Sequence, residues 1–392
     1  MKSIKFIFVL VLTCIVNLSF SQEEKLKFKT KWDNGLKIES TDENFKLKFG
    51  GRLMADYSLF HQNQELNNTF GKLEITDAME IRRSRLFASG SIYKNTAFKL
   101  QIDFTHKKVT LKDVYIHFKN IPIIGNFQVG HFKEPFRLES LTTNKYIMFI
   151  ERAFPTDFTH ERSDGIMIFN DFLNNRLSAQ LGYFKPKDNV GRAVTGRVTG
   201  LLINNEPNNN VLHVGAGFSH RKTESFSISA KPAHLALEYI NTNDITNVKH
   251  VNLLSLESAY IQNSFSLQGE YISSQVKTNL DTYSFSSYYG QASYFLTGES
   301  RNIASSYHGF GRVKPSKPFG ENGGLGAWEV ALRFASANLD SKTIFGGKQE
   351  NVTLGITWYL NSATRIKLNN VLANVKGAGK ANVFQVRFQI DF

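Results

Sequence analysis

The last eleven residues carry the pattern that most restricts the fold of this chain. In the segment NVFQVRFQIDF, residues 382–392, every second residue from Phe384 onwards is apolar or aromatic, and polar or charged residues stand between them. Successive side chains of a strand point to opposite faces of a sheet, so the segment is predicted to be a strand with one apolar and one polar face. The same period of two recurs over residues 45–59, 98–105, 177–183, 328–334 and 352–358.

Two all-β architectures accommodate such strands, a secreted β-sandwich and a transmembrane antiparallel β-barrel. A charge that faces lipid near the bilayer midplane costs about 2–4 kcal/mol, which explains an apolar face free of charge. The aromatic residue Phe392 at the end suits the edge of a membrane. We favour the barrel. At about 23 residues per strand and connection, the chain accommodates about sixteen strands, which enclose a water-filled lumen.

The first residues have the features of a secretory leader. Lys2 and Lys5 precede an apolar run that is too short to span a membrane, and the small residues Ser19 and Ser21 follow it. We expect residues 1–21 to be a signal peptide and residues 22–392 to form one barrel domain in the outer membrane. Cleavage would remove Cys14, the single cysteine, so the mature chain would have neither disulfides nor thiolate metal sites.

Charge and motif content restrict the partners. A net charge of +13 favours anions, and export makes nucleic acid the least suitable of them. The ten histidines form no H-E-x-x-H spacing, and no G-x-S-x-G is present. The segment THERSD, residues 159–164, is a weak candidate for a catalytic site. We therefore expect no enzyme, no metal and no cofactor.

One long stretch, residues 133–163, lacks alternation. It holds two prolines and is too apolar for a disordered segment, yet too long for a hairpin turn. A loop that folds into the lumen and constricts it is the interpretation we prefer. The alternative is an outward loop that packs against neighbouring subunits.

The segment IRRSR, residues 81–85, conflicts with simple alternation. Ile81, Arg83 and Arg85 share one parity, whereas Arg82 and Leu86 share the other. Neither parity is free of charge before Leu86, which indicates a bulge or a strand end near the arginines. Such a bulge would let both Arg82 and Arg83 approach the lumen.

Several ordered blocks of sequence resemble the phosphate-selective porin O and P family. They are NGLKIESTDENFKLKFGGRLMADY, IRRSRLFASGSIYKNTAFKLQIDF, LKDVYIHF, VGHFKEPFRLESLTTNKYIMFIER and GRVKPSKPFGENGGLGAWEVALRF. The similarity runs from about residue 34 to the final strand. It implies a sixteen-stranded outer-membrane barrel that assembles as a homotrimer and passes small anions.

The resemblance also implies a set of residues in the narrow zone of the channel. The blocks place them at Arg52, Arg82, Arg83, Asp113, Thr142, Thr143, Asn144, Lys145 and Arg152. The chain departs from the family pattern at Thr143 and Asn144, where serines are usual, and at Ser140, where a lysine is usual. These changes keep hydrogen-bonding capacity but remove one positive charge.

Arginine suits an oxyanion channel, because its guanidinium stays charged and can bind phosphate through two parallel hydrogen bonds. Outside the matched motifs, lumen parity adds Lys46, Lys48, Arg365, Lys367 and Arg387 as further possible sources of positive field. We expect a porin for passive uptake of phosphate, polyphosphate or similar small anions, in contact with outer-membrane lipid. A non-specific diffusion porin is the alternative, and an outer-membrane enzyme or ligand-binding protein is a third.

Overall fold

The computed structural model describes residues 26–105, 109–159, 161–185, 191–205, 209–305, 307 and 309–392. The expected signal peptide, residues 1–21, and His160 of the THERSD segment lie outside the described residues. Within the described part, no helix has the length and apolar character that a membrane span requires.

Sixteen long strands follow one another around a closed sheet, as counted over the described residues. They are β3 (Phe45–Gln62), β4 (Asp77–Ile92), β5 (Thr96–Asp103), β6 (Thr110–Ile121), β7 (Gly125–Lys133), β8 (Arg162–Phe172), β9 (Leu177–Lys185), β10 (Arg192–Asn205), β11 (Asn210–Lys222), β14 (Val248–Gln262), β15 (Phe265–Thr278), β16 (Thr282–Phe295), β19 (Ala327–Ser341), β20 (Ile344–Tyr359), β21 (Thr364–Val375) and β22 (Gly379–Asp391). Each pairs antiparallel with the next, which confirms the predicted strand type and number.

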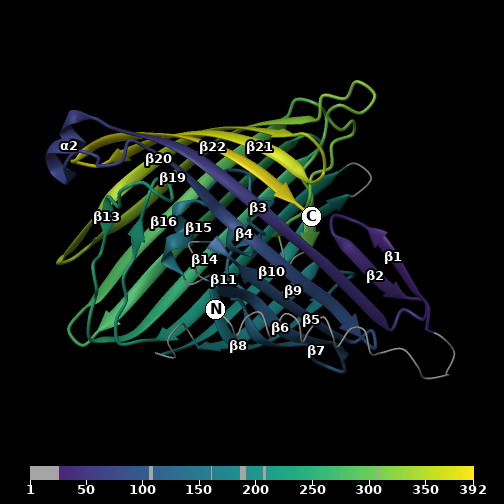
Figure 1. The fold of residues 1–392 in the computed structure, drawn as a ribbon. Coiled ribbons are helices and arrows are strands. Elements are labelled where there is room, and N and C mark those ends of the chain that lie inside the picture. Colours follow the sequence, from purple (N-terminus) through teal and green to yellow (C-terminus); the bar gives the residue numbers. More distant parts are fainter. Residues whose placement is uncertain are drawn as a thin grey trace, which may run out of the picture.

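The last strand closes the barrel by pairing with the first. Antiparallel pairing of β22 with β3 runs from Ala381 opposite Gln62 to Asp391 opposite Arg52. Figure 1 shows the yellow β22 beside the purple β3, with all strands tilted across the wall. A short hairpin of β1 (Phe28–Trp32) and β2 (Leu36–Ser40) precedes the barrel and extends the sheet from β3. Closure removes the free edges that an open sheet would expose.

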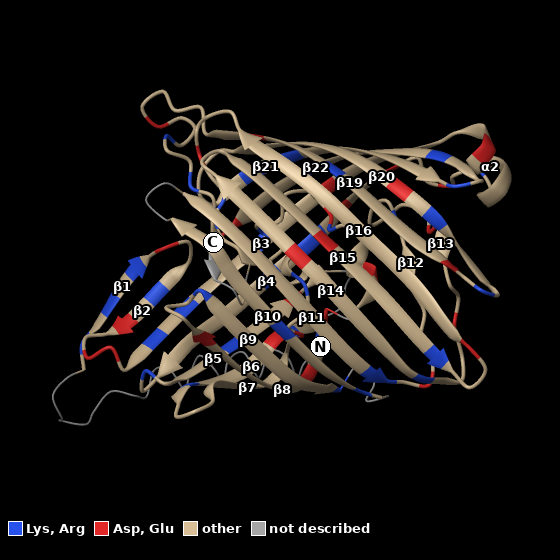
Figure 2. Ribbon diagram, turned by 180° about the vertical axis from the view of Figure 1, so that it is seen from behind, with Lys and Arg blue, Asp and Glu red and all other residues tan. Residues whose placement is uncertain are grey.

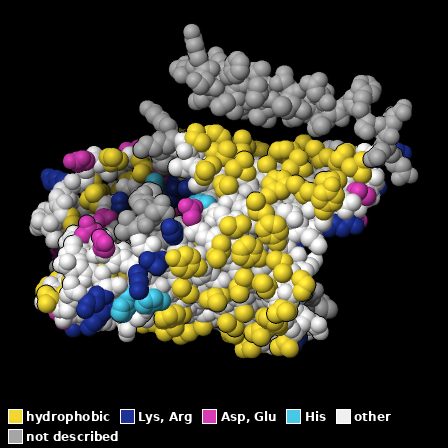
Figure 3. Space-filling view, turned by 90° about the horizontal axis from the view of Figure 1, so that it is seen from below, with side chains coloured by type: hydrophobic (Ala, Val, Ile, Leu, Met, Phe, Trp, Pro, Cys, Tyr) yellow, Lys and Arg dark blue, Asp and Glu magenta, His cyan; other side chains and the backbone are white. Residues whose placement is uncertain are grey.

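The barrel wall has its apolar side chains outside and its polar side chains inside, the reverse of a soluble protein. On β22, Phe388 is 54% exposed on the outside, whereas its neighbours Arg387 and Gln389 are 0% and 2% exposed inside the barrel. Figure 3 shows hydrophobic side chains spread over the outer wall, with charged side chains towards its two ends. This distribution excludes the β-sandwich and fits a wall that faces lipid.

A β-bulge resolves the conflict in IRRSR. Met54 of β3 lies opposite Arg83, but the next residue, Ala55, lies opposite Ile81, so Arg82 is the extra residue. Ile81 is 49% exposed on the outer face although Arg83, of the same parity, is buried inside. The bulge therefore directs both Arg82 and Arg83 inward, as the sequence predicted.

The connections differ between the two ends of the barrel. One end, here called the loop end, carries residues 63–76, 134–161 and 223–247; the first of these contains α2 (Gln64–Phe70). The other end, here called the turn end, carries the short turns 93–95, 122–124 and 173–176 and one long connection, 296–326. The long connections also contain α3 (Leu138–Leu141), η2 (Phe154–Phe158), β12 (Ser229–Ala230), β13 (Ile240–Asn241), β17 (Ile303–Ser305) and β18 (Gly309–Phe310).

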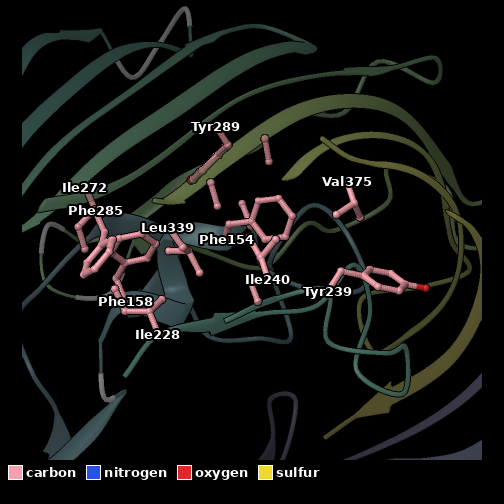
Figure 4. Close-up of a cluster of buried hydrophobic side chains, with 14 of the residues drawn as sticks. Phe154, Phe158, Ile228, Tyr239, Ile240, Ile272, Phe285, Tyr289, Leu339 and Val375 are labelled. Carbon is pink, nitrogen blue, oxygen red and sulfur yellow. The ribbon is translucent and has the colours of Figure 1, made fainter. Parts of the chain in front are cut away.

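Three of the long connections fold into the barrel, not just the predicted one. Phe154 and Phe158 of the 134–161 loop form a buried cluster with Ile228 and Ile240 of the 223–247 connection and with wall residues of β15, β16 and β19. Figure 4 shows these side chains meeting inside the wall. From the turn end, the backbone N–H of Phe310 donates to Thr142 Oγ1 of the loop at 3.2 Å. The inward interpretation of the loop is thus confirmed, and the outward one is wrong.

Candidate functional site

The loop of residues 134–161, here called the inner loop, is held by basic side chains of the barrel wall. Lys367 of β21 donates to the carbonyl oxygens of Ile147 at 2.6 Å, Met148 at 3.2 Å and Phe149 at 3.4 Å. Arg365, two residues earlier on the same face, donates to the carbonyl oxygen of Lys145 at 2.9 Å.

Other strands continue this contact along the same stretch of backbone. Arg387 of β22 donates to the carbonyl of Ile150 at 2.7 Å, and Arg333 of β19 donates to that of Glu151 at 2.9 Å. Arg301 of the 296–326 connection reaches the carbonyl of Tyr146 at 3.1 Å. Seven successive carbonyl groups, residues 145–151, therefore accept hydrogen bonds from cationic side chains.

Most of these cations are also paired with carboxylates. Arg387 makes two hydrogen bonds of 2.6 Å to Asp56 of β3. Arg365 is 2.9 Å from Asp391, and Arg301 is 2.7 Å from Glu329. Lumen parity predicted that Arg365, Lys367 and Arg387 provide a positive field for mobile anions. In the structure, their N–H groups instead donate hydrogen bonds to carbonyl oxygens of the inner loop. Figure 2 shows basic and acidic residues on neighbouring strands of the wall.

A cavity of about 370 Å³ lies between the inner loop and strands β3–β9. Its basic lining residues are Arg52, Arg85, Lys99, Lys119, Lys133 and Arg162, and its acidic ones are Asp113, Glu161 and Asp171. The lining is therefore predominantly positive. His117, Gln101, Gln128 and the inner-loop residues Thr143 and Asn144 add neutral hydrogen-bonding groups.

Arg52 joins the wall to the inner loop at this cavity. Its Nη1 donates to Thr143 Oγ1 at 3.2 Å and to Asn144 Oδ1. Among the described residues, no carboxylate lies within ion-pair distance of its guanidinium. The partners are neutral oxygens, so the positive charge of Arg52 is oriented but not cancelled. Two of the three positions at which the chain departs from its family pattern, Thr143 and Asn144, are thus the ones that orient this arginine.

Asp113 has a different setting from the other predicted residues. Its carboxylate bridges Lys99 at 2.8 Å and Arg162 at 2.7 Å. Arg162 also pairs with Glu161 of the inner loop at 2.8 Å. Asp113 therefore fixes two cations at the cavity wall and lowers their combined charge.

Arg82 and Arg83 do not line this cavity but lie further towards the loop end on β4. Arg82 Nε donates to Glu151 Oε1 of the inner loop at 3.1 Å. Arg83 is 5% exposed, its Nη1 is 3.8 Å from Met54 Sδ, and its Nε has no hydrogen-bond partner within the described residues. The bulge thus gives one arginine a carboxylate partner and leaves its neighbour without one.

The remaining predicted residues shape the inner loop itself. Thr142 Oγ1 donates to the carbonyl of Leu138 at 2.8 Å, and Arg152 donates to the carbonyls of Glu139 at 2.9 Å and Thr142 at 2.8 Å. Lys145 Nζ lies 3.4 Å from Asp391. Burial in the loop lowers the pKa of Lys145 to about 7, although Asp391 opposes this effect.

Of the nine predicted residues, the cavity brings together Arg52, Asp113, Thr143 and Asn144. The set missed Arg85, Lys99, Lys119, Lys133 and Arg162. Alternation along β5 already placed Lys99 on the polar face, so that signal was present in the sequence. Arg162, which follows the inner loop directly, had no comparable signal, because its direction depends on where β8 begins.

Comparisons with known proteins identify the family of this barrel. A model of the family described as phosphate-selective porin O and P matches residues 47–392. The chain belongs to this family. Porin O of Pseudomonas aeruginosa is 28% identical over 415 residues, which cover 93% of this chain and 92% of the relative.

Solved structures share the barrel of this family member. An anion-selective porin from Comamonas acidovorans has a TM-score of 0.60 at 15% identity, covering 89% of this chain and 100% of that one. OmpF of Salmonella typhi in complex with daunomycin has a TM-score of 0.58 at 14% identity, covering 93% and 100%. The chain is an outer-membrane porin.

Proposed function

We propose that this porin passes small anions selectively, with phosphate as a preferred solute. The observation that carries the proposal is the charge of the cavity, where six Lys and Arg side chains face three Asp and Glu side chains. The similarity to Porin O and to the anion-selective porin supports the same proposal of anion selectivity.

Arg52 is the residue best suited to meet a passing anion. Thr143 and Asn144 hold its guanidinium, and no described carboxylate cancels its charge. A phosphate at this position would gain two hydrogen bonds from Arg52 and further ones from the hydroxyl and amide groups nearby. Since conduction requires release as well as entry, several moderate contacts serve a channel better than one tight site.

A non-specific diffusion porin is the second candidate. The bridging of Lys99 and Arg162 by Asp113 favours it, because paired cations exert a weaker field on a mobile ion. We propose that the unpaired charge of Arg52 outweighs this effect, and that the protein is a channel without enzymatic activity. An esterase assay with lipid substrates addresses the third candidate, an enzyme.

Reconstitution in planar bilayers tests the proposal. A potassium chloride gradient should give a reversal potential that indicates anion preference, and added phosphate should reduce the chloride current. A reversal potential without anion preference, together with chloride current that is unaffected by phosphate, would favour the diffusion porin. We also expect three copies in the assembly, which native mass spectrometry of the detergent-purified protein can count.

A further inference from the structure

A groove on the outer rim of the barrel is lined by basic residues that do not line the cavity of the pore. It has a volume of about 580 Å³ and lies where β9 and β11 end and β10 and β14 begin. Lys185, Arg192, Lys222 and Lys249 line it, and Glu224 is the acidic residue of its lining. These strand ends belong to the loop end, which faces outward in barrels with short periplasmic turns.

The four basic residues lie close to one another at the strand ends. Arg192 lies directly opposite Lys222 in the register of β10 and β11, an arrangement that destabilises an antiparallel pair when both residues carry the same charge. Lys249 is the extra residue of a bulge at the start of β14. Within the described part of the chain, none of the four side chains forms an ion pair. An anion from outside the chain would relieve this repulsion.

A second hollow lies along the same strands. It has a volume of about 780 Å³ and is lined largely by apolar side chains of the outer wall, including Leu181, Val198, Phe218 and Leu254. Gly196 lies among them, and a methyl group added there would meet no heavy atom closer than 3.5 Å. The hollow is therefore open to an apolar chain lying against the wall.

The two hollows are in line with each other. Leu181 and Lys185 lie on the same face of β9, about 13 Å apart along the strand at the usual rise per residue. In Figure 3, basic side chains gather at the left end of the hydrophobic wall, and a few lie at its right end. A ligand that fits both hollows has an anionic head at the outer rim and apolar tails that run towards the membrane centre.

We propose that the groove and the hollow together bind a phosphorylated glycolipid of the outer leaflet. Lys and Arg bind phosphate through charge-assisted hydrogen bonds, and clusters of them beside an apolar surface select anionic lipid heads. The acyl chain occupies the hollow over Gly196. The site lies on the outer wall, so it is independent of the selectivity proposed for the pore.

Native mass spectrometry of the full-length porin, mixed with bisphosphorylated lipid A, tests this site. The double variant Arg192→Glu/Lys222→Glu should bind at least tenfold more weakly than the natural protein. The control Lys314→Glu/Lys317→Glu makes the same change in charge at two exposed lysines of the turn end and should bind normally. Lipid A without phosphates and phosphatidylglycerol should bind weakly, and inorganic phosphate should not displace the bound lipid A.

A third variant keeps the test independent of folding defects caused by charge reversal. Gly196→Leu fills the hollow without touching the groove and should also weaken lipid A binding. The proposal fails if both the double variant and Gly196→Leu bind lipid A as well as the natural protein does. It also fails if lipid A without phosphates binds the natural protein as tightly as bisphosphorylated lipid A does. It fails as well if the double variant alters the number of subunits in the assembly but leaves lipid A binding unchanged.

Discussion

Lys367 and Ile147 are 220 residues apart in sequence, yet Lys367 Nζ lies 2.6 Å from the carbonyl oxygen of Ile147. This contact joins the barrel wall to the inner loop inside the barrel. With Arg365 and Arg387, Lys367 converts the basic face of β21 and β22 into a support for the loop backbone. Basic residues in a porin lumen therefore serve two purposes here, and only some of them are available to solutes.

Replacement of Lys367 by methionine should loosen the inner loop. Lys367→Met leaves buried carbonyl groups without their donor, at a cost of about 1–3 kcal/mol. Single-channel recordings should then show additional flickering between current levels. Lys348→Met, at an exposed lysine of β20 whose side chain lies 3.8 Å from Asp340, is the control and should leave the recordings unchanged. Recordings of Lys367→Met that are as quiet as those of the natural protein would contradict the anchoring role.

Two single-residue deletions test the bulge in β4. Deletion of Arg82 removes the extra residue and leaves Ile81 outward and Arg83 inward in strict alternation. Deletion of Ser84 also gives strict alternation, but it directs Arg83 to the lipid, at a cost of up to about 2–4 kcal/mol. We expect the Arg82 deletion to fold with nearly natural yield and the Ser84 deletion to fold poorly. Heat-dependent mobility in gels and the urea midpoint measure this difference, and equal midpoints would contradict it.

Loss of charge at Arg52 should reduce anion selectivity. Arg52→Gln retains a donor for Thr143 and Asn144 but removes a charge worth about 1–2 kcal/mol to a nearby anion. The phosphate concentration that halves the chloride current should rise by about tenfold, the equivalent of 1.4 kcal/mol. Lys314→Gln, at an exposed position of the turn end, provides the same loss of charge as a control. An unchanged phosphate block in Arg52→Gln would remove Arg52 from the site.

The selectivity of the channel should depend on pH through Lys145. Burial lowers the pKa of this inner-loop lysine to about 7, so its ammonium is charged below that pH and neutral above it. Anion preference should therefore decrease as the pH rises from 6 to 8.5. Lys145→Met should show a smaller change over the same range. Reversal potentials at the two pH values measure both effects, and identical pH dependence in the two proteins would exclude Lys145 as the cause.

Parts of the site were accessible from the sequence and parts were not. Alternation identified the inward face of β3 and β22, including Arg52 and Arg387, because a lipid-facing charge is costly. It did not show that Arg387 pairs with Asp56 and binds the inner loop, since both partners lie far away in sequence. The cavity residue Arg162 was missed because the direction of its side chain depends on where β8 begins.

The sequence by itself determined the architecture of this protein. Period-two alternation through to Phe392 indicated a membrane barrel, and the adjacent arginines of IRRSR indicated a bulge or a strand end, of which the structure has the bulge. Only the tertiary structure decided which basic residues are free and which are paired. A strand pattern fixes the face on which a side chain lies, but its hydrogen-bond partners depend on where the inner loop and the two other inward connections come to rest. That position is set by packing between segments such as Phe154 and Ile240, which no local pattern encodes.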